Sequence, residues 1–122
     1  DNSKIVSYLP VMERIISEIP APEYTTYVLV DIDPSQFIAV NGVITGLVDT
    51  EAYVIAPREL DFIALEYVLD KRSAKLISKG YETILPIPDL EPVRTVYRYL
   101  YRLIEVQGSD DIDDWLNQPV LF

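Results

Sequence analysis

The 122-residue chain contains no cysteine and no histidine. The absence of Cys excludes disulfides and thiolate metal sites, and the absence of His excludes imidazole bases and most zinc sites. The sequence also lacks any apolar run near the roughly 20 residues that a membrane-spanning helix needs. Any chemistry must therefore use carboxylates, hydroxyls, amides, lysine or arginine.

Positive charge is scarce as well, because 20 acidic and 10 basic residues give a formal net charge of −10. Such a surface repels phosphate backbones, so we expect no nucleic-acid partner, and the short apolar runs predict no membrane partner. The charge suits cationic partners or a site where metal ions offset the acid, and it also serves solubility. With 49% hydrophobic residues, the chain is predicted to fold as a single cytoplasmic domain spanning 1–122.

Apolar spacing and turn residues predict an α+β fold that is mainly α-helical. Residues with three- and four-residue apolar spacing predict helices over 3–19, from Pro57 through 58–71, and over 93–104. The segment "SAKLISKGYETI" is expected to continue as a helix or as a broken pair of turns that ends near Gly80. "YVLV" (27–30) is typical of a strand, and Asn41-Gly42 between two apolar runs predicts a hairpin. A short last helix is expected after a Ser109 cap, and Gly108 is expected to end the helix before it.

The predicted helix over 93–104 carries arginine at four-residue spacing. We expect these arginines on a solvated face, paired with acidic neighbours (Glu91 and Glu105): Arg94, Arg98 and Arg102. Tyr97 and Tyr101 lie on the apolar stripe and are predicted to be in the core, whereas Tyr99 is predicted to point elsewhere.

Asp31 and Asp33 stand two residues apart where the predicted strand ends, in "VDIDPS". The simplest interpretation is a turn in which an aspartate binds its own backbone. An EF-hand calcium loop would need Gly at its sixth position and Glu at its twelfth, where the chain has Gln36 and Gly42. Calcium binding of that type is therefore excluded.

The strand and acidic pair in "YVLVDID" also resemble the phosphatases of the haloacid-dehalogenase type. In those enzymes one aspartate of such a pair is the nucleophile and the other the acid/base, and "GSDDIDD" (108–114) is similar to their distal magnesium motif. That fold requires further parallel strands between the two motifs. Residues 57–107 instead have helical spacing, so the phosphatase is the weaker alternative.

A further spacing links the acidic pair to the hairpin. Gln36 lies five residues after Asp31, and Asp49 ends the second hairpin strand in "VITGLVDTE". A hairpin holds its two ends side by side, so Asp31 and Asp49 are predicted to face one metal cluster. Together with "PRELDF" (57–62), this pattern resembles the aminoglycoside phosphotransferase and choline kinase-like family, whose motif is H-G-D-x-x-x-x-N, a hairpin and a metal-binding Asp.

The resemblance implies the C-terminal lobe of a protein-kinase-like fold, whose hairpin carries the catalytic and metal-binding loops. By resemblance, Asp31 is the catalytic residue that accepts or orients the substrate hydroxyl proton, Gln36 and Asp49 hold Mg²⁺ at the phosphates of ATP, and Asp61 bonds the catalytic-loop backbone. The implied acceptor is a small molecule with a hydroxyl, with cationic acceptors among the candidates. The implied N-terminal nucleotide-binding lobe is absent from the 122 residues, so the fragment alone is expected to be inactive.

Three positions depart from the family motif. Leu29 stands where the motif has His, Gln36 replaces Asn, and Asp33 adds a carboxylate beside the expected phosphate site. These departures keep a second hypothesis open, a catalytically degenerate kinase-like protein that binds without transferring phosphate.

Overall fold

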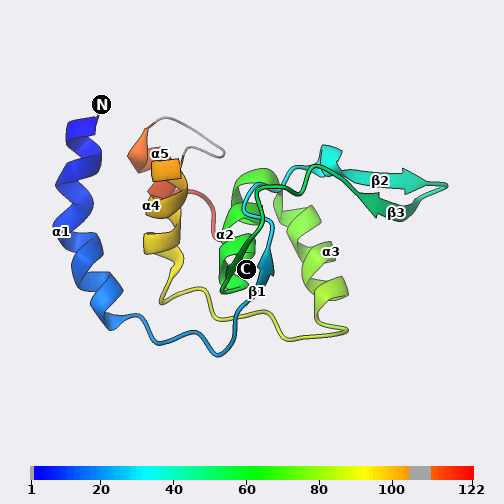
Figure 1. The fold of residues 1–122 in the computed structure, drawn as a ribbon, viewed down its shortest axis with the longest axis horizontal. Coiled ribbons are helices and arrows are strands. Elements are labelled where there is room, and N and C mark those ends of the chain that lie inside the picture. The colour runs from blue at the N-terminus through cyan, green and yellow to red at the C-terminus, as the bar shows by residue number, and fades with distance from the viewer. Residues whose placement is uncertain (1, 105–110) are drawn as a thin grey trace.

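The computed structural model describes residues 2–104 and 111–122, which form a small α+β structure, about half helical, with two small antiparallel sheets (Figure 1). The helices are α1 (Asn2–Glu18), α2 (Glu59–Val68), α3 (Lys71–Tyr81), α4 (Arg94–Ile104), α5 (Ile112–Leu116) and the short 3₁₀ helix η1 (Pro34–Gln36). The strands are β1 (Thr26–Val28), β2 (Phe37–Val40), β3 (Val43–Leu47) and β4 (Val54–Ala56). The predicted helices and the hairpin are confirmed.

Helix α2 lies between α4 and α3 and forms the centre of the larger core cluster (Figure 1). Its buried residues are consecutive or nearly so, and they cover several faces of the helix: Leu60, Phe62, Ile63, Ala64 and Glu66. A helix that is apolar on most sides is covered by neighbours on most sides. Val28 from β1, Tyr101 from α4 and Trp115 from α5 pack into the same cluster.

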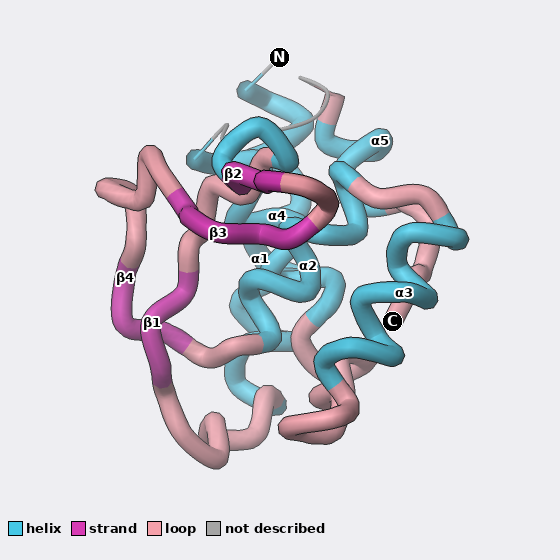
Figure 2. The backbone as a smooth tube through the Cα atoms, turned by 90° about the vertical axis from the view of Figure 1, so that its right-hand side faces the viewer, coloured by secondary structure: helices cyan, strands magenta, loops and turns pink. Residues whose placement is uncertain are grey.

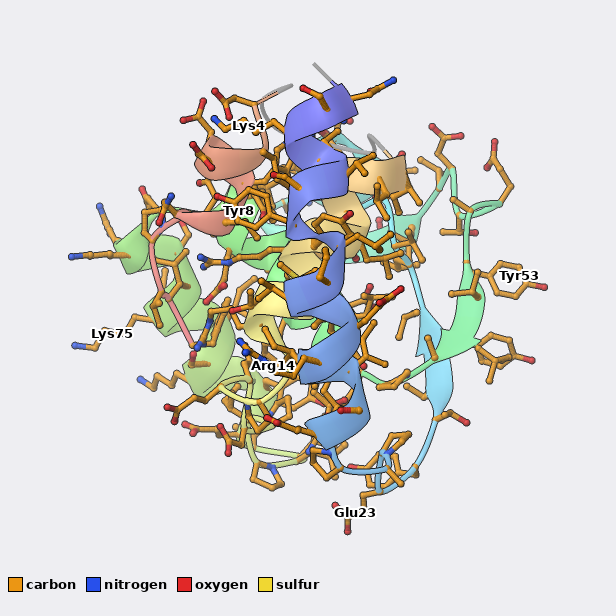
Figure 3. All side chains as sticks on the ribbon, turned by 90° about the vertical axis from the view of Figure 1, so that its left-hand side faces the viewer. Lys4, Tyr8, Arg14, Glu23, Tyr53 and Lys75 are labelled. Carbon is orange, nitrogen blue, oxygen red and sulfur yellow. The ribbon has the colours of Figure 1, made fainter. Side chains whose placement is uncertain are left out.

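The smaller core cluster joins α1 to α4 and α5. Ile5 and Met12 of α1 are buried there with Val96 and Tyr99 of α4. Outside this contact α1 is open to solvent, as Figure 3 shows for the side chain of Arg14. No helix within the described ranges combines the length and the apolarity needed to cross a membrane.

In chain order the β2–β3 hairpin comes between β1 and β4, and in space it lies apart from the β1–β4 pair (Figure 2). Thr26 pairs with Ala56 and Val28 with Val54, whereas Phe37 pairs with Leu47 across the hairpin. The Asn41-Gly42 turn has φ of +51° and +79°, as a type I′ turn requires. The phosphatase alternative needs β1 inside a parallel sheet, but β1 pairs with β4 and is antiparallel to it.

The prediction that the arginines of α4 form a solvated face is wrong. Arg98 and Arg102 are 3% and 5% exposed. Arg98 donates to Glu66 Oε2 at 2.7 Å, and Arg94 lies 3.4 Å from the same oxygen. The reason is tertiary: α2 presents a fully buried carboxylate to α4, and a buried carboxylate needs cationic partners.

Tyr99 points away from the Tyr101 cluster, as predicted, but its ring is buried against α1 and its hydroxyl donates to the Ile5 carbonyl at 3.0 Å. Helix α4 packs on α2 with one side and on α1 with another, so its buried surface is wider than one apolar stripe. Tyr101 is buried as predicted, and Tyr97 is half-buried. The expectations for Glu105, Gly108 and Ser109 lie outside the described residues; the described cap of α5 is Asp111.

Candidate functional site

The chain that leads from β1 into Asp31 makes a tight turn centred on Val30. The Asp31 N–H donates to the Leu29 carbonyl at 2.7 Å, and Val30 has φ of +66°. Together these features describe a strained γ-turn, which a β-branched residue rarely adopts. A residue held in such a conformation stores about 1–3 kcal/mol. Contacts from the rest of the molecule must therefore hold this loop.

Asp61, in the first turn of α2, provides those contacts. Its carboxylate accepts the Leu29 N–H at 3.0 Å through both oxygens and the Val30 N–H at 3.1 Å. Burial raises the pKa of Asp61 above its ordinary value, while the two backbone donors act in the opposite direction. The backbone contact that the family resemblance implied for Asp61 is confirmed.

The side-chain amide of Gln36 joins the two acidic loops. Asp33 caps η1 by accepting the Ser35 N–H at 2.8 Å, and the Asp33 N–H donates to Gln36 Oε1 at 3.1 Å. Gln36 Nε2 donates to the Asp31 carbonyl at 3.0 Å and to the Asp49 carbonyl at 3.3 Å. Because one buried nitrogen contacts both carbonyls, the loop after β1 and the loop after β3 meet at Gln36.

The strand order explains why these loops meet. The chain leaves the β1–β4 ladder through residues 29–36 and returns to it through 48–53, so the two segments run side by side. The Val48 N–H donates to the Gln36 carbonyl at 2.9 Å between them. Asp49 follows with φ of +61° and turns the chain away from the hairpin toward β4.

The structure thus brings the loops of Asp31, Gln36 and Asp49 together, but their side chains differ in solvent exposure. The side chains of Asp31 and Asp49 are exposed, whereas that of Gln36 is buried and engaged with the backbone. Within residues 2–104 and 111–122, no group of three or more acidic side chains could hold a metal ion. Mg²⁺ that is also bound by phosphates needs only one or two protein carboxylates. Asp31 and Asp49 each present one exposed carboxylate from loops that meet at Gln36.

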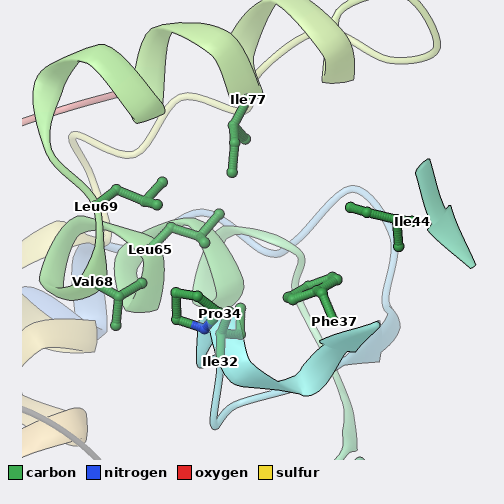
Figure 4. A pocket seen from close by; sticks show the side chains of 8 residues that line it. All are labelled: Ile32, Pro34, Phe37, Ile44, Leu65, Val68, Leu69 and Ile77. Carbon is green, nitrogen blue, oxygen red and sulfur yellow. The ribbon is translucent and has the colours of Figure 1, made fainter. Parts of the chain in front are cut away.

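The hairpin beyond this junction is apolar and exposed. Residues 37–48 include no charged side chain, and Val43 and Ile44 are 63% and 65% exposed. A groove of about 290 Å³ lies between the hairpin and helices α2 and α3 (Figure 4). Its lining is apolar and includes residues that flank the acidic pair: Ile32, Pro34, Phe37, Ile44, Leu65, Val68, Leu69 and Ile77.

Sequence reasoning missed the strained residue and the fourth strand. Val30 is the last residue of the apolar run "YVLV", so the sequence pattern predicts that the strand continues through Val30. No neighbouring residue type indicates a left-handed backbone conformation at this position. Strand β4 is three residues long and lies directly before the Pro57 signal for α2. Asp49 could have been noticed as a left-handed residue, because Asp tolerates that conformation.

No family model, curated protein or solved structure matches the chain. Functional inference therefore depends on the strained turn at Val30, its Asp61 anchor and the Gln36 junction.

Proposed function

We propose that the chain is the C-terminal lobe of an ATP-dependent small-molecule kinase of the aminoglycoside phosphotransferase type. One observation carries the proposal: Asp61 holds a strained turn that leads into Asp31, and Gln36 ties that loop to the loop of Asp49. Phosphoryl transfer depends mainly on positioning and charge neutralisation. Two exposed carboxylates on rigidly joined loops suit both tasks.

In this proposal Asp31 accepts or orients the proton of the acceptor hydroxyl. A general base must keep its position within hydrogen-bond reach of the proton that it removes. The Asp31 backbone is held on one side by the γ-turn to Leu29 and on the other by Gln36 Nε2. The exposed carboxylate therefore projects from a fixed point.

The metal-binding role falls to Asp49 and Gln36. When bound, Mg²⁺-ATP supplies the phosphoryl group and the positive charge that neutralises the phosphate oxygens. Asp49 offers an exposed carboxylate to such an ion. Gln36 Oε1 uses one lone pair for the Asp33 N–H and keeps a second, so the amide could bind an ion without breaking the junction.

The apolar hairpin supports a further part of the proposal, an N-terminal nucleotide-binding lobe that packs against it. Contiguous exposed apolar surface marks an interface, and a lone two-stranded hairpin is marginally stable in water. Val40, Val43 and Ile44 would be covered in that arrangement. Because the phosphate-binding lysine and covering loop belong to that other lobe, the 122 residues alone are expected to be inactive.

The acceptor in this proposal is a small molecule with a hydroxyl, and a positive charge on it would suit a chain of net charge −10. The same charge argues against nucleic acid as a partner. We propose the cytoplasm, where ATP and Mg²⁺ are supplied together, as the place of action.

A metal titration of a polypeptide that carries both lobes tests the proposal, with Mn²⁺ in place of Mg²⁺. Water-proton relaxation would report Mn²⁺-ATP binding to the wild type and to Asp49→Asn. We expect the affinity of Asp49→Asn to be about tenfold lower, because a carboxylate ligand is lost. Glu13→Gln on α1 makes the same charge change at the other end of the molecule and should bind as the wild type does. Equal affinities for Asp49→Asn and wild type would contradict the metal assignment.

A turnover measurement tests the catalytic role in a polypeptide that carries both lobes. Asp31→Asn should lower kcat by about 100-fold or more with little change in the KM for ATP, since only the proton acceptor is lost. Undiminished ATP-dependent turnover in that variant would remove Asp31 from the mechanism.

The second candidate is a kinase-like protein that binds without catalysis. The observation in its favour is that the Gln36 amide is already engaged in three backbone hydrogen bonds, and that Leu29 replaces the motif histidine. Calorimetry with Mg²⁺-ATP on the two-lobe protein separates the candidates. Metal-dependent nucleotide affinity with turnover favours the kinase, and the absence of both favours the binding protein.

A further inference from the structure

Helix α3 concentrates positive charge in an acidic chain. It carries four of the ten basic residues, all of them exposed: Lys71, Arg72, Lys75 and Lys79. None of the four forms an ion pair with another described residue. Figure 3 shows the Lys75 side chain extending away from the body of the molecule.

The other basic residues are mostly used within the fold. They contact acceptors of the chain or lie buried: Lys4, Arg58, Arg94, Arg98 and Arg102. Arg14 on α1 is the remaining one, exposed and outside every ion pair of the described residues. Positive charge that has no structural use is therefore gathered on α3.

The four cations occupy one face of the helix. At about 100° per residue, Lys71, Lys75 and Lys79 follow one another along the axis, and Arg72 lies beside Lys79 in projection. Ala74 and Ile77 project from the opposite side and face the protein. Leu76, 64% exposed, borders the cations and adds an apolar side chain to this basic face.

The stability of α3 does not explain this arrangement. Lys71 and Arg72 stand in the first turn, where the helix dipole disfavours cations. Lys71, Lys75 and Lys79 are spaced four residues apart, so neighbouring like charges repel one another. Glu82 follows the helix but forms no ion pair with a described cation. Lys79, in the last turn, is the one of these cations that the helix dipole favours, so helix stability accounts for that position and not for the pattern.

We propose that the basic face of α3, with Leu76, binds an acidic segment of a partner protein. The face is one helix wide, which matches a single segment with carboxylates at similar spacing. A bilayer or a nucleic-acid duplex would extend beyond α3 and meet the otherwise acidic surface of the chain. Leu76 is the one strongly exposed large apolar side chain within α3, so the helix lacks the broad apolar face that lies in a membrane interface. This surface is independent of the proposed phosphotransfer site.

Binding of a synthetic helical peptide to the 122-residue chain tests the proposal. The peptide has glutamates at four-residue spacing and a leucine beside them, and a matched peptide has glutamine in their place. Fluorescence anisotropy should show binding of the glutamate peptide alone, weakening as salt is raised. Lys75→Glu should reduce the affinity by about fivefold or more, because an attraction becomes a repulsion at the centre of the face.

Two further variants, Lys71→Glu and Arg14→Glu, separate effects on binding from effects on folding. Lys75→Glu converts two like-charge pairs into opposite pairs, and Lys71→Glu places an acid at the helix start, so thermal melts should show both variants folded. Arg14→Glu makes the same change in net charge on α1 and should bind the peptide as the wild type does. Equal binding by Lys75→Glu and wild type, or no binding at low salt, would overturn the proposal. Capture by phosphatidylglycerol vesicles without peptide binding, or self-association lost in Lys75→Glu, would also overturn it.

Discussion

Helix α2 carries two buried or largely buried carboxylates that serve opposite sides of the molecule. Asp61 points toward the strands and accepts the neutral N–H groups of Leu29 and Val30. Glu66 points toward α4 and accepts from the guanidinium groups of Arg98 and Arg94 and from the Leu121 N–H. One carboxylate holds a strained loop, and the other holds two helices and the C-terminal segment together.

The two carboxylates differ in the type of hydrogen-bond donor that surrounds them, and the two types of donor have different effects. A guanidinium neutralises the buried charge of Glu66, so this side behaves as a structural core element. The backbone donors leave the Asp61 carboxylate without an ion pair to any described cation, and burial raises its pKa. Burying a carboxylate without a cationic partner lowers the stability of the fold. What this contact provides is a fixed position for the Asp31 loop. Glu66 is therefore structural, and in the proposed function Asp61 is a positioning residue.

Removing the charge of Glu66 should have the largest effect on stability. Glu66→Gln leaves Arg98 buried without a counter-ion, and we expect a loss of about 3–5 kcal/mol in the free energy of unfolding. Urea denaturation measures it. Glu59→Gln makes the same change on the same helix and should cost a few tenths of a kcal/mol, about the value of one dipole contact. If Glu66→Gln lost only as much stability as Glu59→Gln, the Glu66–Arg98 pair would not be a structural anchor.

Compared with Glu66→Gln, Asp61→Asn should lower the free energy of unfolding less and weaken Mn²⁺-ATP binding more. An amide keeps one acceptor and turns a donor toward the Leu29 and Val30 N–H groups, so the expected loss is about 1–3 kcal/mol. In the two-lobe polypeptide and at equal folded fraction, Mn²⁺-ATP should bind more weakly to Asp61→Asn than to Glu66→Gln, because only the first change frees the Asp31 loop. The reverse order of affinities would end the distinction between the two anchors.

Much of the fold follows from local signals in the sequence. Periodic apolar residues located α1, α2, α3 and α4, and the Asn41-Gly42 turn located the hairpin. Burial on α4 did not follow, since it depends on which helices cover α4 and on the carboxylate of Glu66 beneath its arginines. Helical spacing shows which residues share a face, but not how many faces are covered.

For the site, the sequence predicted which loops meet and one anchoring contact. The hairpin signal brought the loops of Asp31 and Asp49 together, and the family resemblance supplied the contact of Asp61 with the loop backbone. The γ-turn at Val30 was not predictable from residue type, because the strain of that conformation in valine is offset only by tertiary hydrogen bonds. The metal roles of Gln36 and Asp49 and the catalytic role of Asp31 remain predictions.

Tyr101 connects the two sides and should have an intermediate effect. Its buried hydroxyl donates to the Leu60 carbonyl at 3.0 Å, next to Asp61. Tyr101→Phe removes this second hydrogen bond to a carbonyl of α2, and we expect a loss of about 1 kcal/mol in the free energy of unfolding. Tyr53→Phe, at an exposed ring, should have no measurable effect in the same urea titration. Equal effects would show that the hydroxyl of Tyr101 contributes nothing to holding α4 on α2.

Alkaline pH tests the same contact by a second route. Burial raises the pKa of Tyr101 and of Tyr67 above the ordinary value of 10.0, so the folded state favours neutral tyrosine. The associated stability is present below pH 10 and is lost as pH rises above it, because the unfolded chain ionises first. Urea midpoints should fall above pH 10, and less steeply in Tyr101→Phe. An unchanged slope in that variant would assign the titration to other groups.

The smallest global effect is expected in the hairpin, which lies on the Asp61 side but outside both cores. Gly42 has φ of +79° and open space where a Cβ would lie, so Gly42→Ala costs only backbone strain, about 1 kcal/mol. Gly80→Ala in α3 also meets open space, without a left-handed φ, and should stabilise its helix by up to about 1 kcal/mol. Hydrogen exchange should show faster local opening of residues 37–48 in Gly42→Ala, with global unfolding nearly unchanged. A full loss in global stability would mean that the hairpin folds as one unit with the Glu66 side, and the two sides of α2 would then not be separable.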